Sequence, residues 1–342
     1  MKTTSISTLA LSQSMQSTVS NAMTEVTKLQ DEAVTGTYSD VGLELGTKTS
    51  TSLDYTRESA RLQSIVDSNS FAETRMDASQ LALTNISDSG QSLLDSLTAL
   101  GGNSDVNSLQ VASDSAMSVL ENFVGYANTA ANGEYLFSGI STDVQPFDDD
   151  FITNVTTDFN NAFSDYMSAN GIASASDVTA DQMTDFLSDY ESSFDLSNYT
   201  DASDTVMSTR ISSSETVDTS TSATSDGFQN LVLASVVSSQ LTNAGLSSGA
   251  LQVVSENATQ YAGTAISGVT AQASALGLSQ ERVDKANTYM NNQITIINTQ
   301  LSDLVGVDTD DASVRLSTLL NQVETSYSIT SKILGMSLAD YL

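Results

Sequence analysis

The sequence contains no cysteine and no histidine among its 342 residues. A chain without either residue cannot form a disulfide, a zinc site with thiolate or imidazole ligands, a Ser-His-Asp triad or a cysteine nucleophile. These absences exclude most of the common hydrolase designs.

Proline and basic residues are also scarce. Pro146 is the only proline, where average usage would give about 17, and proline is the residue that helix interiors exclude. The 11 Lys and Arg stand against 42 Asp and Glu, for a net charge of −31. The first scarcity favours long helices, and the second argues against a nucleic-acid partner, which needs clustered positive charge.

Long apolar runs are missing. The densest run, 231–237, has seven residues and contains Ser235, far fewer than the ~18 that a membrane span needs. The first 16 residues have one lysine and no continuous apolar core, so we expect neither a Sec signal nor a membrane partner.

A heptad pattern covers residues 62–100, and nine of its twelve seam positions are apolar. It predicts a helix about 58 Å long at ~1.5 Å per residue, with a stripe too narrow for any partner except another long helix. The seam positions are Leu62, Ile65, Asn69, Ala72, Met76, Ser79, Leu83, Ile86, Gly90, Leu93, Leu97 and Leu100.

The same spacing returns over 109–130 and over 269–304, and steps of four residues, typical of a stutter, connect 251–265 to the latter. We therefore expect a mainly α fold, in which the two halves of the chain form a long antiparallel bundle or coiled coil. The residues predicted to pack within one subunit are Leu62, Ile65, Met76, Leu83, Ile86, Leu93, Leu97, Leu276, Val283, Met290, Ile294, Ile297 and Leu301.

Both ends carry thinner apolar stripes. One runs from Leu11 to Ala33 and is ended by Gly36, and the other begins after the helix-start signal Asp308, Asp310 and Asp311. Neither stripe buries enough apolar surface to offset its ordering entropy alone. We expect the ends to order fully only against other subunits, through Leu11, Met15, Val19, Val26, Leu29, Leu316, Leu319, Val323, Leu334, Leu338, Tyr341 and Leu342.

The middle of the chain, 141–222, has a different composition, with nine of the 21 Phe and Tyr and 16 acidic residues against Arg210 alone. It predicts a small, mixed α+β insert domain, with a capping box at Thr179 and Gln182 and a strand or hairpin over 206–217. The expected domains are then 1–45 with 305–342, 46–140 with 223–304, and 141–222.

Two acidic clusters invite a chemical interpretation. Asp148, Asp149 and Asp150 lie between two Phe residues, and they could form either a catalytic carboxylate pair of the glycosidase type or a solvated turn. The cluster after Asp308 lacks the ligand and glycine that an EF-hand loop needs next, so a helix start explains it better. We expect no catalytic, cofactor or metal site, and a generic coiled-coil rod stays an alternative on these patterns.

A local motif favours one family over a generic coiled-coil rod. The segment Asn132 to Gly139, with Gln145, Pro146 and Phe147 after it, resembles a signature of the hook-filament junction proteins of the bacterial flagellum, the hook-associated protein 3 (FlgL) family of the flagellin superfamily. The ending 334–342 resembles that of the same family. The matching motif residues are Gly133, Tyr135, Leu136, Phe137, Ser138 and Gly139.

The resemblance implies a subunit whose terminal helices pair in an inner tube domain, with an outer helical rod and a solvent-facing insert. It implies a non-enzymatic junction protein, exported by the flagellar type III system to the extracellular hook-filament junction. Its implied partners are hook-associated protein 1 (FlgK), flagellin, copies of itself in a ring, and an export chaperone that binds 316–338. A flagellin-type filament subunit is the alternative, since it shares the helical ends.

Overall fold

The computed structural model describes residues 8–101 and 105–339, with only the backbone for 8, 9, 11, 12 and 333–339, and 77% of it is helical. The mainly α fold class is confirmed. None of the described helices is both long enough and apolar enough to cross a membrane. The chain forms two compact units, a terminal unit of Met1–Ser64 with Met290–Leu342 and a central unit of Ile65–Tyr289.

The terminal unit contains α1 (Thr8–Thr35), α2 (Val41–Leu45), η1 (Gly46–Lys48) and α9 (Thr309–Ala339), together with the first turns of α3 (Thr49–Leu100) and the last turns of α8 (Ser248–Val305). Gly36 ends α1 as the sequence predicts, because it takes the positive φ of +70° that closes a helix C-terminus. Asp308 begins α9, and its Oδ1 accepts the backbone N–H groups of Asp310 and Asp311 at 3.0 and 3.2 Å.

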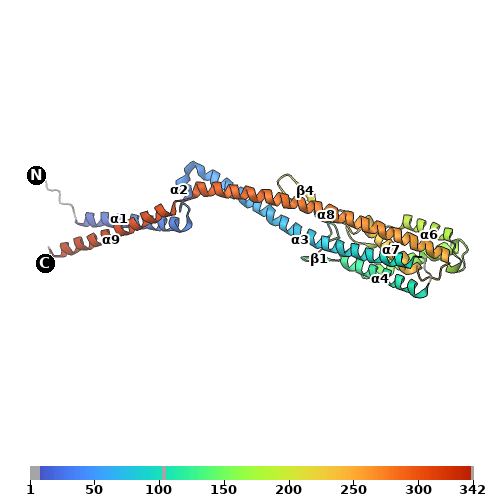
Figure 1. The fold of residues 1–342 in the computed structure, drawn as a ribbon. Coiled ribbons are helices and arrows are strands. Elements are labelled where there is room, and N and C mark those ends of the chain that lie inside the picture. The colour runs from blue at the N-terminus through green and yellow to red at the C-terminus, as the bar shows by residue number, and fades with distance from the viewer. Residues whose placement is uncertain (1–7, 102–104, 340–342) are drawn as a thin grey trace. The chain divides into compact units, whose positions relative to one another are not determined.

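The central unit is built on α3 and α8, with α4 (Val106–Ala127) and α7 (Asp226–Leu241) packed against each other (Figure 1). Eleven of the twelve predicted seam positions of α3 are buried, and Ile65 is half-buried. The segment 251–265 lies within α8 and joins the later heptads without a break. Its five apolar residues at the predicted spacing are buried: Leu251, Val254, Ala258, Tyr261 and Ala265. Both findings confirm the long helices predicted from the heptad spacing.

Polar contacts show that α3 and α8 run antiparallel. Asn69 donates to Asn287 over 2.7 Å, and Gln80 donates to the carbonyl of Ala273 over 2.7 Å. Within the terminal unit, the Ser59 hydroxyl contacts the side chain of Asn298 at 3.0 Å. As residue numbers rise along α3 they fall along α8, so the first seam has its partner in the same chain.

The helix α7 was not expected as a separate core element. Its run 231–237 is buried on every side, which explains why it is apolar all round. At its start the backbone of Gly227 lies against that of Gly268 on α8, where a Cβ added to either glycine would come within 2.6 Å of backbone atoms of the other helix. This close approach brings α7 directly against α8.

The segment 141–222 contains α5 (Phe151–Ala169), η2 (Ala175–Asp177), α6 (Ala180–Ser193), η3 (Leu196–Tyr199) and an antiparallel hairpin of β3 (Ser208–Arg210) and β4 (Thr216–Asp218). The Thr179–Gln182 capping box is present at the start of α6. Both the helical content and the hairpin agree with the mixed insert that we expected.

This insert shares its core with the helical rod. Phe147 and Phe151 pack on Phe123 of α4, with ring centroids 5.2 and 6.5 Å apart, and Phe228 of α7 lies 5.2 Å from the same ring. The compact units accordingly divide the chain near residues 64 and 289 rather than at the ends of the insert. The aromatic side chains join one continuous core because no polar layer separates the insert from α4 and α7.

Candidate functional site

The terminal helices α1 and α9 pair with each other along the terminal unit. Gly36 lies beside Thr309, and Thr330 lies 3.6 Å from the sulfur of Met15, so the two helices are antiparallel. Their most buried apolar residues are Val26, Leu29, Ala312 and Val323, each at most 8% exposed. Among the described side chains of α1, this burial is confined to the last third of the helix.

The same helix pair leaves several large apolar side chains open to solvent. Val34 of α1 and Val314 of α9 are 81% and 66% exposed. A two-helix pair has too little interior to cover apolar residues on more than one side of each helix. Among the described side chains, the exposed large apolar residues of α1 and α9 are Met23, Val34, Val314, Leu320, Tyr327 and Ile329.

The predicted assembly residues fall into three groups. Val26, Leu29 and Val323 are buried between α1 and α9 of one chain, so they stabilise the pair itself. The other described members, Met15, Val19, Leu316 and Leu319, are half-buried. The remaining predicted contacts, at Leu11, Leu334, Leu338, Tyr341 and Leu342, involve side chains outside the described residues.

The two chain connections below the helix pair are hydrogen-bonded to each other. Thr37 and Gly306 form an antiparallel bridge, flanked by Tyr38 N–H donating to Val305 and Val307 N–H donating to Gly36. A Cβ on Gly306 would lie 2.4 Å from the carbonyl oxygen of Ser302, so only glycine fits there. We call this crossing, residues 36–40 with 305–308, the elbow.

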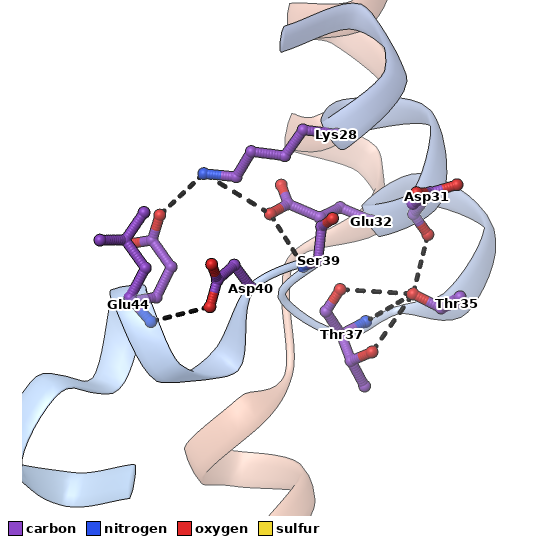
Figure 2. Close-up of polar contacts among 9 residues, drawn as sticks. Lys28, Asp31, Glu32, Thr35, Thr37, Ser39, Asp40 and Glu44 are labelled. Carbon is purple, nitrogen blue, oxygen red and sulfur yellow. Dashed lines mark hydrogen bonds and ion pairs between the residues drawn. The ribbon is translucent and has the colours of Figure 1, made fainter. Parts of the chain in front are cut away.

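A polar cluster braces the elbow from α1 (Figure 2). The ammonium of Lys28 donates to Glu44 of α2 over 2.8 Å and lies 3.9 Å from Glu32. The Glu32 carboxylate is buried, and it also accepts the backbone N–H of Ser39 at 3.2 Å. Asp40 caps α2 by accepting from Leu43 N–H. The hydrogen bond to Glu44 raises the pKa of Lys28, so the ammonium stays charged.

The motif residues 133–139 have a structural role in the central unit. Gly133 completes the tight turn between β1 (Ala130–Ala131) and β2 (Glu134–Tyr135) with a φ of +85°. Leu136, Phe137 and Ser138 are completely buried. Ser138 forms a bridge with Ser222, which brings together the two ends of the insert.

Gly139 shows why this motif ends in glycine. Its φ is +59°, and a Cβ would lie 2.3 Å from the carbonyl oxygen of Ser203 and 2.4 Å from that of Thr205. The neighbouring backbone accepts a hydrogen bond from Ser203 N–H at Ser138, and Ile140 N–H donates to Thr205. The motif therefore holds the chain where the insert leaves the rod.

Arg75 of α3 supports the short β1–β2 hairpin from below. Its guanidinium pairs with Glu134 and donates to the carbonyl of Tyr135 at 2.8 Å. Burial lowers the pKa of Arg75, and the Glu134 carboxylate opposes that shift. A hairpin of two-residue strands has little stability of its own, so this contact fixes it to the rod.

The predicted packing residues within the subunit are not equally buried. Met76, Leu83, Ile86, Leu93, Leu97, Leu276, Val283 and Met290 are at most 2% exposed, and Leu62 is 3% exposed. Ile65, Ile294, Ile297 and Leu301 are half-buried. Around Ile294 to Leu301 the facing side of α3 carries polar residues such as Ser59, which cannot seal the seam there.

The acidic clusters provide no assembled site among the described residues. Asp148, Asp149 and Asp150 are exposed in the turn before α5, as a solvated turn predicts. No group of three or more acidic side chains in the described parts of the chain has a geometry that could hold a metal ion. The sequence does not predict the ion pairs Lys28–Glu44 and Arg75–Glu134, because the partners lie 16 and 59 residues apart in the chain.

Comparisons with known proteins agree with this arrangement. Residues 6–142 match the family model for the bacterial flagellin N-terminal helical region, and residues 259–342 match that for the C-terminal helical region. Among curated proteins, none matches the sequence at a significant level.

One solved structure with the same fold is described as a candidate flagellar hook-associated protein from Vibrio parahaemolyticus. The alignment covers 75% of this chain and 97% of that one, with a TM-score of 0.52 and 11% sequence identity, so the likeness concerns the fold. The two family regions together cover more than half of the chain and contain α1, α3, α9 and most of α8. The chain therefore belongs to the flagellin family of structural flagellar proteins.

Proposed function

We propose that this protein is the junction subunit that connects the flagellar hook to the flagellin filament. The observation that carries an assembly role is the α1–α9 pair, in which six large apolar side chains among the described residues are exposed in a single chain. Apolar side chains that one chain leaves uncovered on this helix pair are available to pack against neighbouring copies. The resemblance of residues 132–139 to the junction-protein signature favours the junction over the filament.

In this proposal, the terminal helix pair packs against equivalent pairs in neighbouring copies that form a ring. Its preceding partner is hook-associated protein 1 (FlgK), and its following partner is flagellin. The central unit keeps its shape through its own core, since its seam residues are already buried within one chain. The protein acts by packing, with no catalytic step.

Export and location complete the proposal. The chain travels through the flagellar type III system to the extracellular end of the hook, and an export chaperone binds within 316–338. Export as an unfolded chain suits a protein without cysteine, because no disulfides have to form or break.

A flagellin-type filament subunit is the second candidate, because both matching family models are those of flagellins. The two functions differ in what the purified protein does alone. A filament subunit forms long polymers, whereas a junction subunit adds a layer of limited size to an existing end.

The decisive experiment adds the purified chain to isolated hooks that carry FlgK, and then adds flagellin. A junction protein binds the hook ends and is required for flagellin to polymerise there, and cells that lack it release unpolymerised flagellin into the medium. Long filaments of the chain alone would favour the second candidate, and binding to neither hooks nor flagellin would contradict both.

A further inference from the structure

We propose that Lys28, Glu32 and Glu44 form a lock that sets the direction in which the α1–α9 pair leaves the elbow. We call these three residues the elbow lock. The inference rests on the proposed function in one respect, which is that the direction matters because neighbouring copies must meet the helix pair in a single orientation. The lock itself is a property of one chain.

The first argument is the position of Lys28. It lies on α1, and its ammonium reaches across the elbow to Glu44 on α2, 16 residues further on (Figure 2). This side-chain contact between α1 and α2 spans Gly36, which lies between the two helices and has a positive φ. Fixing the two helices to each other limits the backbone freedom that this glycine introduces.

The second argument is the burial of Glu32. Its side chain is 7% exposed, and an ionised carboxylate at that depth needs a cation or hydrogen-bond donors. Lys28 provides the cation and Ser39 N–H provides a donor. Because Ser39 belongs to the elbow, Glu32 connects the charge of Lys28 to the elbow backbone.

The third argument is the gradient of burial along α1. Val26, Leu29 and Glu32 are buried close to the elbow, whereas the described residues 13–20 are exposed or half-buried. The base of the helix pair is therefore held by its own chain, and the more distant turns remain available to other copies. A defined base allows the distant turns to be presented in one direction.

The lock is expected to control orientation more than stability. The side chains of Lys28 and Glu44 are 28% and 38% exposed, and ion pairs at such positions add little to the free energy of folding. Their effect comes from fixing the direction of α1 relative to α2. Salt should weaken the lock because exposed charges are screened.

Spin-label distances test the proposal directly. The native chain has no cysteine, so Ser17→Cys on α1 and Leu53→Cys on α3, both exposed, carry the only two labels in the full-length protein. The unsubstituted lock should give one narrow distance distribution. Glu44→Gln should lose the narrow peak, and Lys28→Arg, which keeps the charge and the reach, should retain it.

Glu25→Gln is the matched control. Glu25 is an exposed carboxylate on the same helix, three residues before Lys28, and its substitution removes the same charge without removing the contact to α2. A broad distribution in the unsubstituted protein, or a narrow one in Glu44→Gln, would overturn the lock.

The same variants separate the lock from the proposed function. Binding to isolated hooks should fall for Glu44→Gln and stay unchanged for Glu25→Gln. If Glu44→Gln loses the narrow peak but binds hooks normally, the lock stands and the claim that its orientation governs assembly is overturned. If the unsubstituted protein shows the narrow peak but binds no hooks, the lock stands and the junction function fails.

Discussion

Asn69 on α3 donates a hydrogen bond from Nδ2 to Oδ1 of Asn287 on α8 over 2.7 Å, within a mainly apolar helix seam. The same Nδ2 donates to the carbonyl of Ile211, just after β3, at 3.0 Å. Asn69 is completely buried, and its Oδ1 has no hydrogen-bond partner among the described residues. A polar pair in an apolar seam favours one register, since any slip leaves the amides unpaired.

Asn69→Leu should therefore destabilise the central unit by about 1–3 kcal/mol, because Asn287 and the Ile211 carbonyl lose their donor. Asn69→Leu combined with Asn287→Leu should recover part of that loss, because an apolar pair replaces the polar one. Urea unfolding of the two single variants and the double variant measures the coupling. Strictly additive losses would show that the two amides do not interact.

A charge introduced into the α3–α8 seam should reduce the free energy of unfolding more where the replaced side chain is more deeply buried. Leu83→Asp buries a carboxylate at a site with no solvent access, so it should reduce the free energy of unfolding by about 4 kcal/mol or more. Ile294→Asp, at a half-buried site, should cost only about 1–2 kcal/mol. Thermal melting of both variants tests the difference. Equal losses of stability would contradict the conclusion that the seam is better buried at Leu83 than at Ile294.

Two neighbouring residues of α9 should separate assembly from folding. Leu320 is 47% exposed, so Leu320→Asp should leave the helical far-UV spectrum unchanged and reduce binding to hooks. Val323 is 6% exposed, so Val323→Asp should separate α1 from α9 and make both protease-sensitive in the free chain. Normal hook binding by Leu320→Asp would argue against this face as an assembly surface.

Gly139→Ala tests the role of the motif glycine, and Gly125→Ala is its control. Gly139→Ala forces a Cβ into two carbonyl oxygens at a positive φ, so it should destabilise the protein by more than about 2 kcal/mol. Gly125 lies inside α4 with no atom within 4 Å of an added Cβ, so Gly125→Ala should stabilise by up to about 1 kcal/mol. Urea unfolding compares them, and a tolerated Gly139→Ala would remove the explanation given for the motif.

Alkaline pH should destabilise the insert through Tyr199. Burial, and next the hydrogen bond to Asp158, raise the pKa of Tyr199 from 10.0 to about 12. The folded state therefore favours the neutral phenol, so this stability is fully present below pH 10 and is lost between pH 10 and about 12.

Tyrosinate absorbance and urea unfolding across that pH range check the effect. Tyr199→Phe should reduce the loss of stability above pH 10. Asp158→Asn should move the Tyr199 titration to lower pH, because it removes one cause of the raised pKa. The remaining pH dependence should come from Tyr190 and Tyr261, whose pKa values burial also raises.

The long helices could be predicted because their signal is local and repeats. Heptad spacing placed Met76, Leu83 and Ile86 on one face, and the structure buries all three. The glycine after α1 and the aspartates at the start of α9 act through backbone groups only a few residues away, so their roles could also be predicted. The core that the insert shares with the rod could not be predicted in the same way, because Phe147 and Phe151 meet Phe123 of α4 across sequence separations longer than any helical repeat.

The chain's periodicity and composition alone determined that this protein is helical, that its halves pair, and that its ends carry only thin apolar stripes. Tertiary structure decided which stripe residues, such as Val323, are already covered in one chain, and which, such as Leu320, are not. It also brought Lys28 to Glu44 and Arg75 to Glu134. The physical reason is that helical periodicity specifies which face is apolar, whereas the partner that covers this face depends on contacts between distant parts of the chain.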